Sequence, residues 1–510
     1  MIGRRAVLAG TAALAAAPLM ARDPVVTAKA GRWRGTSEGG VQLFRGIRYG
    51  EDTSRARFQA PRAPAPGRDT LPALAFGPSC PQRGGSDLAQ AEDCLFLNVW
   101  TPGADPRAKR PVMVYFHGGA YSSGTVIEPR VFGCRLAADG DVVVVTVNQR
   151  LNALGHLYLA RLSPAFADSG NAGQLDLILA LGWVRDNIAA FGGDPARVMV
   201  FGQSGGGAKI ATLMAMPAAR GLFHAAATMS GQQVTASGPL NATRRTGAYL
   251  AKLGVADPAA LLTMPVERLV EGLDAEDPIL GGGVYFGPVL DMKWLTRHPF
   301  WPDAHPQGNA IPLILGNTHD ETRAFIDPNG PKLAGLGWDN IAARIAPELR
   351  IDVLPEWVVA QYRARFPAMS PTDLFYAATT AGRSWRGQVI EAEERAKASA
   401  PAWVYQLDFQ SPIEPIRGAP HGHDIPLVFG TLDAEGSITG TGAAARALSR
   451  RMMAAFVSLA REGDPGQGWP RYTLPERRTM IFDVESRIES DPRRWQRELF
   501  ARIPYIQPGT

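Results

Sequence analysis

Short apolar runs alternate along this chain with longer stretches that have helical spacing. The runs that predict β-strands are residues 95–101, 112–116, 142–147, 198–201, 225–229, 313–315 and 403–409. The stretches whose apolar residues recur every three or four positions predict helices at 173–190, 205–216 and 443–461. The run 142–147 is almost wholly apolar, which is typical of a strand buried on both faces of a sheet.

Strands that alternate with helices predict an α/β fold with a large, mostly parallel central sheet flanked by helices. Two regions, 240–312 and 338–400, are less regular, and we expect them to form helical, cap-like insertions. The chain has 510 residues, 45% of them hydrophobic, which is enough for a large core. We expect residues 22–510 to form a single domain, because large α/β folds often run long as one unit.

The first 21 residues have the features of an export signal. Arg4 and Arg5 precede an apolar run at 6–19, and Ala21 offers a small residue for cleavage. This pattern predicts a signal peptide at 1–21 and an exported, periplasmic or secreted protein, and the paired arginines favour the twin-arginine route. The run is too short to cross a bilayer of about 30 Å, and no other stretch is long enough, so we expect no transmembrane segment.

The charge of the chain argues against a nucleic-acid-binding protein, and its cysteine spacing argues against a metal site. The formal net charge is +5, without a dense run of basic residues interleaved with aromatics, so we expect no nucleic-acid partner. The cysteines Cys80, Cys94 and Cys134 lie outside any C-x-x-C or cysteine–histidine spacing, so we expect no metal site.

Residues 202–206, Gly-Gln-Ser-Gly-Gly, match the G-x-S-x-G motif. They directly follow a predicted strand and open a predicted helix, which is the setting that a nucleophile elbow needs. A phosphate-binding loop shares part of this glycine spacing. However, Ala208 and Lys209 stand where that loop requires Lys and Ser or Thr, so the phosphate and magnesium ligands are misplaced. We expect Ser204 to be a nucleophile.

A second glycine-rich segment, His-Gly-Gly-Ala-Tyr at 117–121, follows the predicted strand 112–116. Residues without bulk let the backbone approach a substrate, and loops of this HGG type supply N–H groups to a developing oxyanion. The N–H of Gly205, directly after Ser204, is expected to be a further donor.

The general base must lie well beyond Ser204, because α/β-hydrolases order their residues as serine, acid and histidine. Of the eight histidines, His421 and His423 lie in a loop after the predicted strand 403–409, where a base is expected. Spacing does not separate these two histidines.

The acid should also follow a strand. Asp320 and Glu321 come shortly after the predicted strand 313–315. Either carboxylate could accept the imidazole N–H and hold the ring in one tautomer, so both stay candidates at this point.

Longer segments resemble the type-B carboxylesterase family, which includes the cholinesterases, over nearly the whole mature chain. Residues 92–102, EDCLFLNVWTP, resemble the EDCLxLNVxxP signature, and 191–206 resemble the serine signature along its length. Residues 148–151, 286–289 and 425–430 are also similar to family segments. The resemblance, to bacterial carboxylesterases in particular, implies the α/β-hydrolase fold.

The resemblance also implies the roles of individual residues. The acid is Glu321, in a G-x-x-x-D-E segment, and the base is His421, in a G-x-x-H segment. Ser230 corresponds to a serine that supports the histidine. The oxyanion donors correspond to Gly119, Ala120 and Gly205, with Gly118 in the same loop, and the first disulfide of the family corresponds to Cys80 paired with Cys94.

Three departures from the family pattern bear on specificity. Gln203 stands before the nucleophile where the family usually has Glu, and the segment between Cys80 and Cys94 contains no aromatic residue. Cholinesterases use an aromatic there to hold a quaternary ammonium through cation–π attraction, so both departures argue against choline esters. Gly205 replaces the usual Ala and predicts a more permissive backbone at the oxyanion donor.

The implied reaction is hydrolysis of a small-molecule carboxylic ester through an acyl-enzyme on Ser204, and it needs no metal or organic cofactor. One alternative is cleavage of an amide, carbamate or lactone by the same residues. Another is a non-catalytic binding or adhesion module on this fold, which the filled catalytic positions disfavour. The sequence specifies no oligomeric state.

Overall fold

The computed structural model describes residues 23–84, 89–507 and 509–510, and the predicted signal peptide lies outside them. Its strands are β1 (Val25–Ala28), β2 (Gly31–Arg34), β3 (Thr36–Glu38), β4 (Val41–Arg48), β5 (Thr70–Pro72), β6 (Phe96–Thr101), β7 (Arg110–Phe116), β8 (Val143–Val147), β9 (Gly193–Gln203), β10 (Ala225–Met229), β11 (Leu313–Thr318), β12 (Ala402–Leu407), β13 (Arg478–Phe482) and β14 (Arg487–Ser490).

The α-helices are α1 (Cys134–Gly140), α2 (Asn152–His156), α3 (Ala172–Asn187), α4 (Gly205–Leu213), α5 (Pro239–Leu253), α6 (Val266–Glu271), α7 (Ile341–Leu349), α8 (Pro355–Arg365), α9 (Pro371–Thr380), α10 (Arg386–Lys397), α11 (Asp424–Phe429), α12 (Ala443–Glu462) and α13 (Arg494–Phe500). A π-helical turn, Ala381–Trp385, joins α9 to α10. No described helix is long and apolar enough to cross a membrane.

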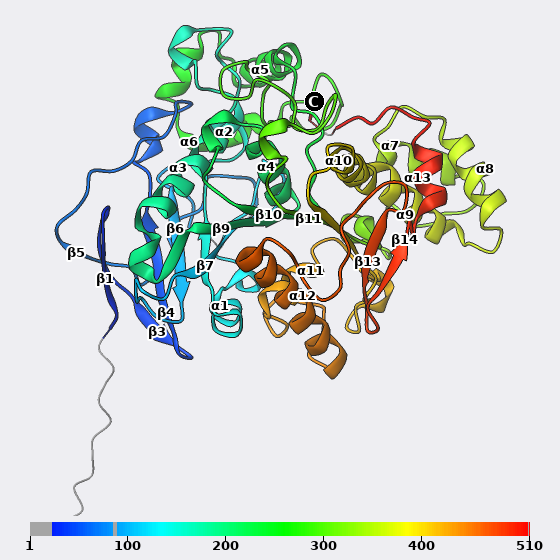
Figure 1. The fold of residues 1–510 in the computed structure, drawn as a ribbon. Helices are drawn as coiled ribbons and strands as arrows, with labels where there is room; N and C mark the ends of the chain where they lie inside the picture. The colour runs from blue at the N-terminus through cyan, green and yellow to red at the C-terminus, as the bar shows by residue number, and fades with distance from the viewer. Residues whose placement is uncertain (1–22, 85–88, 508) are drawn as a thin grey trace, which may run out of the picture.

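Eleven strands form the central sheet in the order β14-β13-β12-β11-β10-β9-β7-β8-β6-β4-β3 (Figure 1). All neighbours from β8 to β13 pair in parallel, whereas the strands at both ends pair antiparallel. The sheet therefore confirms the predicted α/β class. Its parallel strands also bring their carboxyl ends to one edge, which is where an active site is expected in such folds.

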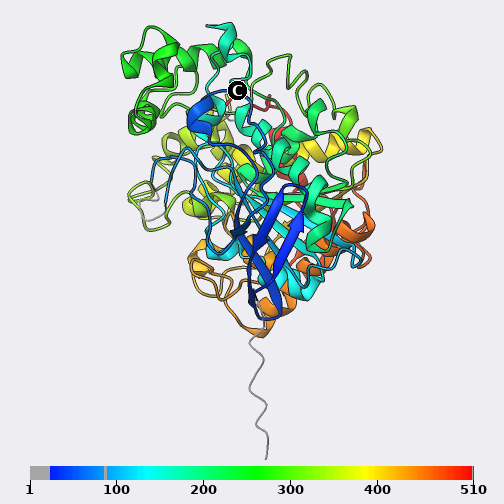
Figure 2. The same ribbon diagram turned by 90° about the vertical axis from the view of Figure 1, so that its left-hand side faces the viewer.

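Helices cover both faces of the sheet, with α3 and α4 on one face and α1, α11 and α12 on the other (Figures 1 and 2). The valine run of β8 explains why both faces need cover. Val143, Val145 and Val147 join the core under α3 and α4, while Val144 and the preceding Val142 join the core under α12. Side chains alternate between faces along a strand, so an all-apolar strand requires a hydrophobic layer on each side.

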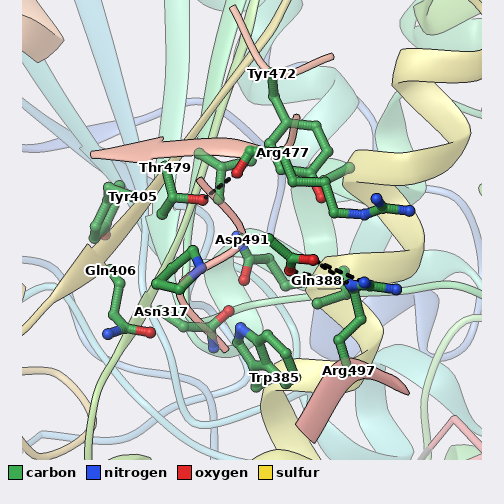
Figure 3. A pocket seen from close by; sticks show the side chains of 14 residues that line it. Asn317, Trp385, Gln388, Tyr405, Gln406, Tyr472, Arg477, Thr479, Asp491 and Arg497 are labelled. Carbon is green, nitrogen blue, oxygen red and sulfur yellow. Dashed lines mark hydrogen bonds and ion pairs between the residues drawn. The ribbon is translucent and has the colours of Figure 1, made fainter. Parts of the chain in front are cut away.

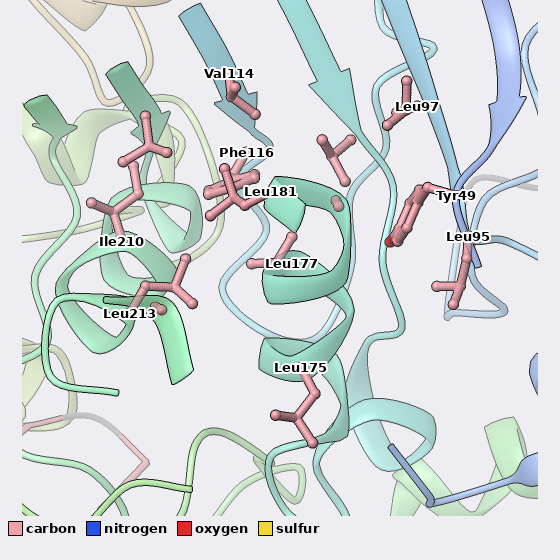
Figure 4. Close-up of a cluster of buried hydrophobic side chains, with 14 of the residues drawn as sticks. Tyr49, Leu95, Leu97, Val114, Phe116, Leu175, Leu177, Leu181, Ile210 and Leu213 are labelled. Atoms are coloured by element: carbon pink, nitrogen blue, oxygen red, sulfur yellow. The ribbon is translucent and has the colours of Figure 1, made fainter. Parts of the chain in front are cut away.

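The core on the α3 side positions the helix that follows Ser204. Leu177 and Leu181 of α3 lie beside Ile210 of α4 and beside Val114 and Phe116 of β7 (Figure 4). All five side chains are fully buried. Burial of such a side chain contributes about 1.5–3 kcal/mol relative to its exposure, so the start of α4 is held firmly against the end of β7.

Both irregular regions of the sequence contain helices. Residues 240–312 include most of α5 and all of α6, and residues 338–400 include α7 to α10. Helices α7, α8, α9 and α13 share a separate hydrophobic cluster at the end of the sheet opposite the N-terminal strands (Figure 1). The division of the chain into one domain with two insertions stays a prediction.

The sequence patterns found the central strands and missed those at the margins. All seven predicted strands are present, although β9 begins at Gly193, five residues before the expected start. Strands β1, β2, β3 and β5 are short and lie in a stretch rich in glycine and proline, and β14 is largely exposed. Their pairing depends on neighbouring strands rather than on an apolar run, so the pattern of hydrophobic residues carries little signal for them.

Candidate active site

Ser204 occupies a sharp turn between β9 and α4, at the carboxyl edge of the parallel strands. Its backbone has φ 56° and ψ −125°, a strained conformation for a residue with a side chain. Ser204 N–H donates to Met229 O at 2.7 Å, and Ser204 O accepts from Ala208 N–H at 3.1 Å. A methyl group on Gly206 would lie 1.9 Å from Phe116 O. The turn therefore has the geometry of a nucleophile elbow. Its crowding explains why residue 206 is a glycine.

Glu321 lies just after β11 and is completely buried. Its Oε1 accepts three hydrogen bonds, from Ser230 Oγ at 2.6 Å, Asn317 Nδ2 at 3.0 Å and the backbone N–H of Thr318 at 2.8 Å. Burial alone would raise the pKa of Glu321. His421 and these donors outweigh it, and the pKa is lowered from its usual value. Glu321 is therefore an ionised carboxylate inside the protein.

His421 completes a pair with this carboxylate, since its Nδ1 donates a hydrogen bond to Glu321 Oε2. Its Nε2 is buried and makes no hydrogen bond to any residue that the structure describes, Ser204 included. The ring of Phe325 lies against the imidazole at a centroid distance of 4.7 Å. Because a carboxylate binds the Nδ1–H, the neutral ring carries its free lone pair on Nε2, as a general base requires.

The alternatives left open by the sequence lie in different surroundings. His423 is buried without a hydrogen-bond partner in the described chain, stacks on Phe409 at 6.1 Å, and burial lowers its pKa to about 4. Asp320 accepts from the backbone N–H of Ala419 at 3.0 Å. Asp320 thus anchors the loop that leads to His421, while the structure brings Glu321 rather than Asp320 to the imidazole.

The loop after β7 has an open row of backbone donors. Gly119 and Ala120 both have positive φ, 78° and 53°. Within the described residues, the N–H groups of Gly118, Gly119, Ala120 and Gly205 donate no hydrogen bond. Free N–H groups from two segments beside a nucleophile are what an oxyanion hole requires.

Gly205 is more constrained than its sequence suggested. A methyl group at this position would lie 2.1 Å from Ala120 O and 2.4 Å from Ala120 Cα. Both neighbours are backbone atoms, which cannot move aside cheaply. The expectation of a permissive backbone is therefore wrong, because the close approach of α4 to the oxyanion loop demands glycine here.

Gln203 is buried, and its Nε2 has no hydrogen-bond acceptor in the described chain. A methyl group on Gly118 would lie 3.2 Å from Gln203 Oε1, and one on Gly422 would lie 3.7 Å from its Nε2. The amide therefore packs between the oxyanion loop and the histidine loop, beside the nucleophile.

Two hollows open near these residues. One, of about 190 Å³, is lined by His421, Gly422 and Ala324 among others. The other, of about 280 Å³, is lined by Ser122, Ser123 and aromatic residues of the segment 285–286, just beyond the oxyanion loop. The first hollow adjoins the base and the second follows the oxyanion loop along the chain, and Ser204 itself lines neither of them.

A further cavity is lined by residues other than Ser204, Glu321 and His421. Asn317, which donates to Glu321, lines this space together with Trp385, Gln388, Tyr405 and Tyr472 (Figure 3). Its volume is about 30 Å³, room for about one water molecule. Ser204 and His421 are absent from its walls, so it is not a substrate site.

The disulfide implied for Cys80 and Cys94 is not formed in the structure. Both are buried free thiols, and Cys134 is a partly buried free thiol. Cys80 and Cys94 are nevertheless neighbours, because the hydrogen bond from the Cys94 thiol to Cys80, together with burial, raises the pKa of Cys94 well above its usual value.

Sequence reasoning did not identify Asn317, Phe325 or Lys209 as parts of this region. Asn317 is a polar residue near the end of a buried strand, and Lys209 is a lysine in a helix of small and apolar residues. Both are exceptions to the local pattern, so they could have been singled out. Phe325 carries no such signal, because an exposed aromatic in a loop is ordinary.

Comparison with known proteins agrees with this geometry. Residues 22–499 match the model of the carboxylesterase family. Para-nitrobenzyl esterase of Bacillus subtilis (strain 168) is 36% identical over 502 residues, 93% of this chain and 98% of the relative. Phenmedipham hydrolase of Pseudarthrobacter oxydans is 30% identical over 91% of this chain and 96% of the relative.

Solved structures give the same result. A carboxylesterase of Geobacillus stearothermophilus superimposes with a TM-score of 0.83 at 34% identity, covering 93% of this chain and 99% of the other. The match extends over the whole α/β-hydrolase fold. The chain therefore belongs to the carboxylesterase family and is a carboxylic-ester hydrolase.

Proposed function

We propose that this enzyme hydrolyses neutral carboxylic esters with Ser204 as nucleophile, His421 as general base and Glu321 as the acid that orients the base. The observation that carries this assignment is the hydrogen bond between His421 Nδ1 and the buried Glu321. That contact leaves His421 Nε2 free to accept a proton. The strained turn at Ser204 supports the same assignment.

The reaction has two steps. Ser204 Oγ attacks the ester carbonyl while its proton passes to His421 Nε2, and the alcohol then leaves with that proton. Water, deprotonated by His421, cleaves the acyl-enzyme and releases the acid. In both steps the negative oxygen is held by the N–H groups of Gly119, Ala120 and Gly205. Loss of one such donor typically costs about 10²–10³ in kcat.

The supporting residues keep the base in one orientation. Ser230 and Asn317 donate to Glu321 Oε1, which leaves Oε2 for the imidazole. The imidazolium that forms during each step then faces a carboxylate that is already ionised, so little reorganisation is needed as charge develops.

Neutral esters fit this site better than cationic ones. Gln203 is uncharged where a buried carboxylate would attract cations, and the segment 81–93 offers no aromatic ring to a quaternary ammonium. The name of the para-nitrobenzyl esterase relative suggests aryl-methyl esters as a starting point. We expect kcat/KM for a neutral ester to exceed that for butyrylcholine by a wide margin.

A substrate panel tests this proposal. Neutral nitrophenyl and para-nitrobenzyl esters of increasing acyl length are compared with butyrylcholine and with a nitroanilide of matched acyl group. We expect ester turnover without comparable anilide or choline-ester turnover. Preference for butyrylcholine would overturn the assignment of neutral esters, and preference for the anilide would assign the site to amide hydrolysis.

We further propose that the protein is exported by the twin-arginine route and that Cys80 and Cys94 become oxidised there. The support is the paired Arg4 and Arg5 at the start of the chain and the neighbouring thiols; exported proteins can keep disulfides. Arg4→Lys with Arg5→Lys should retain the precursor in the cytoplasm. Unchanged export would refute the route, and maleimide labelling of all three cysteines without reductant in the exported protein would refute the disulfide.

A further inference from the structure

One buried lysine lies against the oxyanion loop and takes no part in the reaction described above. Lys209 projects from α4, and only 1% of the residue is exposed. Its Nζ donates to His117 O and to Ala120 O, both at 2.9 Å. In the described part of the chain Lys209 forms no ion pair with a carboxylate, so these backbone carbonyls are its main compensation for lost hydration.

The two carbonyls that Lys209 binds flank the peptide groups that carry the oxyanion donors. In a trans peptide the C=O and the following N–H point in opposite directions. The C=O of Gly118 accepts from His117 Nδ1 at 2.9 Å, and the C=O of Gly119 accepts from the N–H of Ser122 at 3.1 Å. Those two contacts fix the direction of the Gly119 and Ala120 N–H groups. Lys209 binds the carbonyl oxygens of the peptide groups immediately before and after these two, at His117 and Ala120.

Ala120 shows why such a constraint is needed. Its φ of 53° lies in the left-handed region, which a residue with a side chain adopts only when its surroundings enforce it. Its carbonyl points towards α4, where its oxygen accepts a hydrogen bond from Lys209 Nζ and lies next to Gly205. Without a donor there, the partly buried carbonyl of Ala120 would lose its partner and the peptide would favour a different orientation.

We propose that Lys209 is a positioning residue that locks the oxyanion loop onto the helix that follows Ser204. The proposal rests on the proposed function, because it assigns the loop N–H groups to the oxyanion. One side chain then connects the two segments that supply donors, since Gly205 begins the helix and Lys209 lies one turn further along it. Its role is to keep donors from separate segments aimed at one oxygen atom.

The test replaces Lys209 with Met, which is similar in length but donates no hydrogen bond. We expect kcat for a nitrophenyl ester to fall about 10²-fold, the loss typical of one misplaced oxyanion donor, while KM changes less than about threefold. The inhibition constant of a trifluoromethyl ketone, which forms a tetrahedral oxyanion on the serine, should rise in parallel with the loss of kcat/KM. Lys209→Gln keeps two N–H donors and should recover part of the rate.

Thr212→Val is the matched control, because Thr212 is buried on the same helix and bonds Tyr121 Oη at 3.2 Å but not the loop carbonyls. It should lower the melting temperature without a comparable loss of kcat. A folded Lys209→Met enzyme with kcat within threefold of wild type would overturn the proposal, as would an equal loss in Thr212→Val. If Lys209→Met does not fold, a Lys209→Gln enzyme with unchanged kcat and inhibitor affinity would overturn it. Wild-type protein without ester turnover would instead refute the proposed function.

Discussion

Replacing Glu321 with Gln is the most informative change at the base. The substitution keeps the shape of the side chain, so Oε1 can still accept from Ser230 Oγ, Asn317 Nδ2 and the N–H of Thr318. The atom that faces His421 Nδ1 changes from an acceptor oxygen to an NH₂ donor. Two donors cannot share that contact, so His421 must move its proton from Nδ1 to Nε2, where it blocks the lone pair needed by Ser204.

The size of the effect follows from this change of tautomer and from the loss of charge. Loss of the orienting carboxylate with retained geometry costs about 10⁴ in kcat in the serine hydrolase where it was measured. At about 1.36 kcal/mol for each factor of ten, that loss is roughly 5.5 kcal/mol of transition-state stabilisation. We expect a similar loss here, because Glu321 is completely buried and water cannot replace it as the partner of the imidazole.

The assay is the pH dependence of kcat and kcat/KM for a nitrophenyl ester, with melting temperatures to show that the variants fold. Ser230→Ala is the control, since it removes one of three donors to Glu321 Oε1 and leaves the carboxylate in place. A hydrogen bond to a charged group is worth about 1.5–3 kcal/mol, so its loss of rate should be at least tenfold smaller than that of Glu321→Gln. A Glu321→Gln enzyme within tenfold of wild type would refute the reasoning.

Three further changes test other parts of the account. His421→Ala should abolish turnover and His423→Ala should be mild, since only His421 contacts the acid; equal losses in kcat would show that the base is wrongly assigned. Gly205→Ala should lower kcat at least about tenfold, because its methyl displaces the backbone of Ala120, and an unchanged rate would contradict the packing argument. Burial raises the pKa of Glu391 to about 8, so the folded state holds a proton that the unfolded chain releases near its ordinary pKa of 4.5. The stability this provides is present below that pH and is lost as pH rises towards 8. Glu391→Gln should therefore reduce the fall in melting temperature between about pH 5.5 and about pH 8.5. The same fall in the variant as in the wild-type enzyme would contradict this prediction.

The sequence predicted the parts of this enzyme whose signal is local. The valine run of β8 and the glycines around Ser204 reflect constraints on the backbone itself, namely burial on two faces and a crowded turn. Spacing could not choose between His421 and His423, because two residues in one loop differ only in what the rest of the chain places beside them. The resemblance to the carboxylesterases made that choice, and the contact with Glu321 gives its physical basis.

Contacts between distant segments were beyond prediction. Lys209 stands out in the sequence as a lysine among small and apolar residues, but its partners become apparent only when the loop 117–120 is brought against α4. Gly205 appeared to add freedom, whereas its neighbour Ala120 removes the space for any side chain. In both cases the deciding atoms are backbone carbonyls 85–92 positions away in the sequence, and no pattern of residue types specifies where a carbonyl points.

Covalent trapping at Ser204 tests the central claim most directly. Purified mature enzyme is mixed with a nitrophenyl ester, quenched in acid during the first turnover, digested and analysed by mass spectrometry, with Ser204→Ala as the control. The account predicts a burst of nitrophenol, one acyl group on the peptide that contains Ser204, and loss of both with turnover reduced by up to about 10⁶-fold in Ser204→Ala. Turnover by Ser204→Ala near the wild-type rate, or an acyl group on another residue, would contradict it.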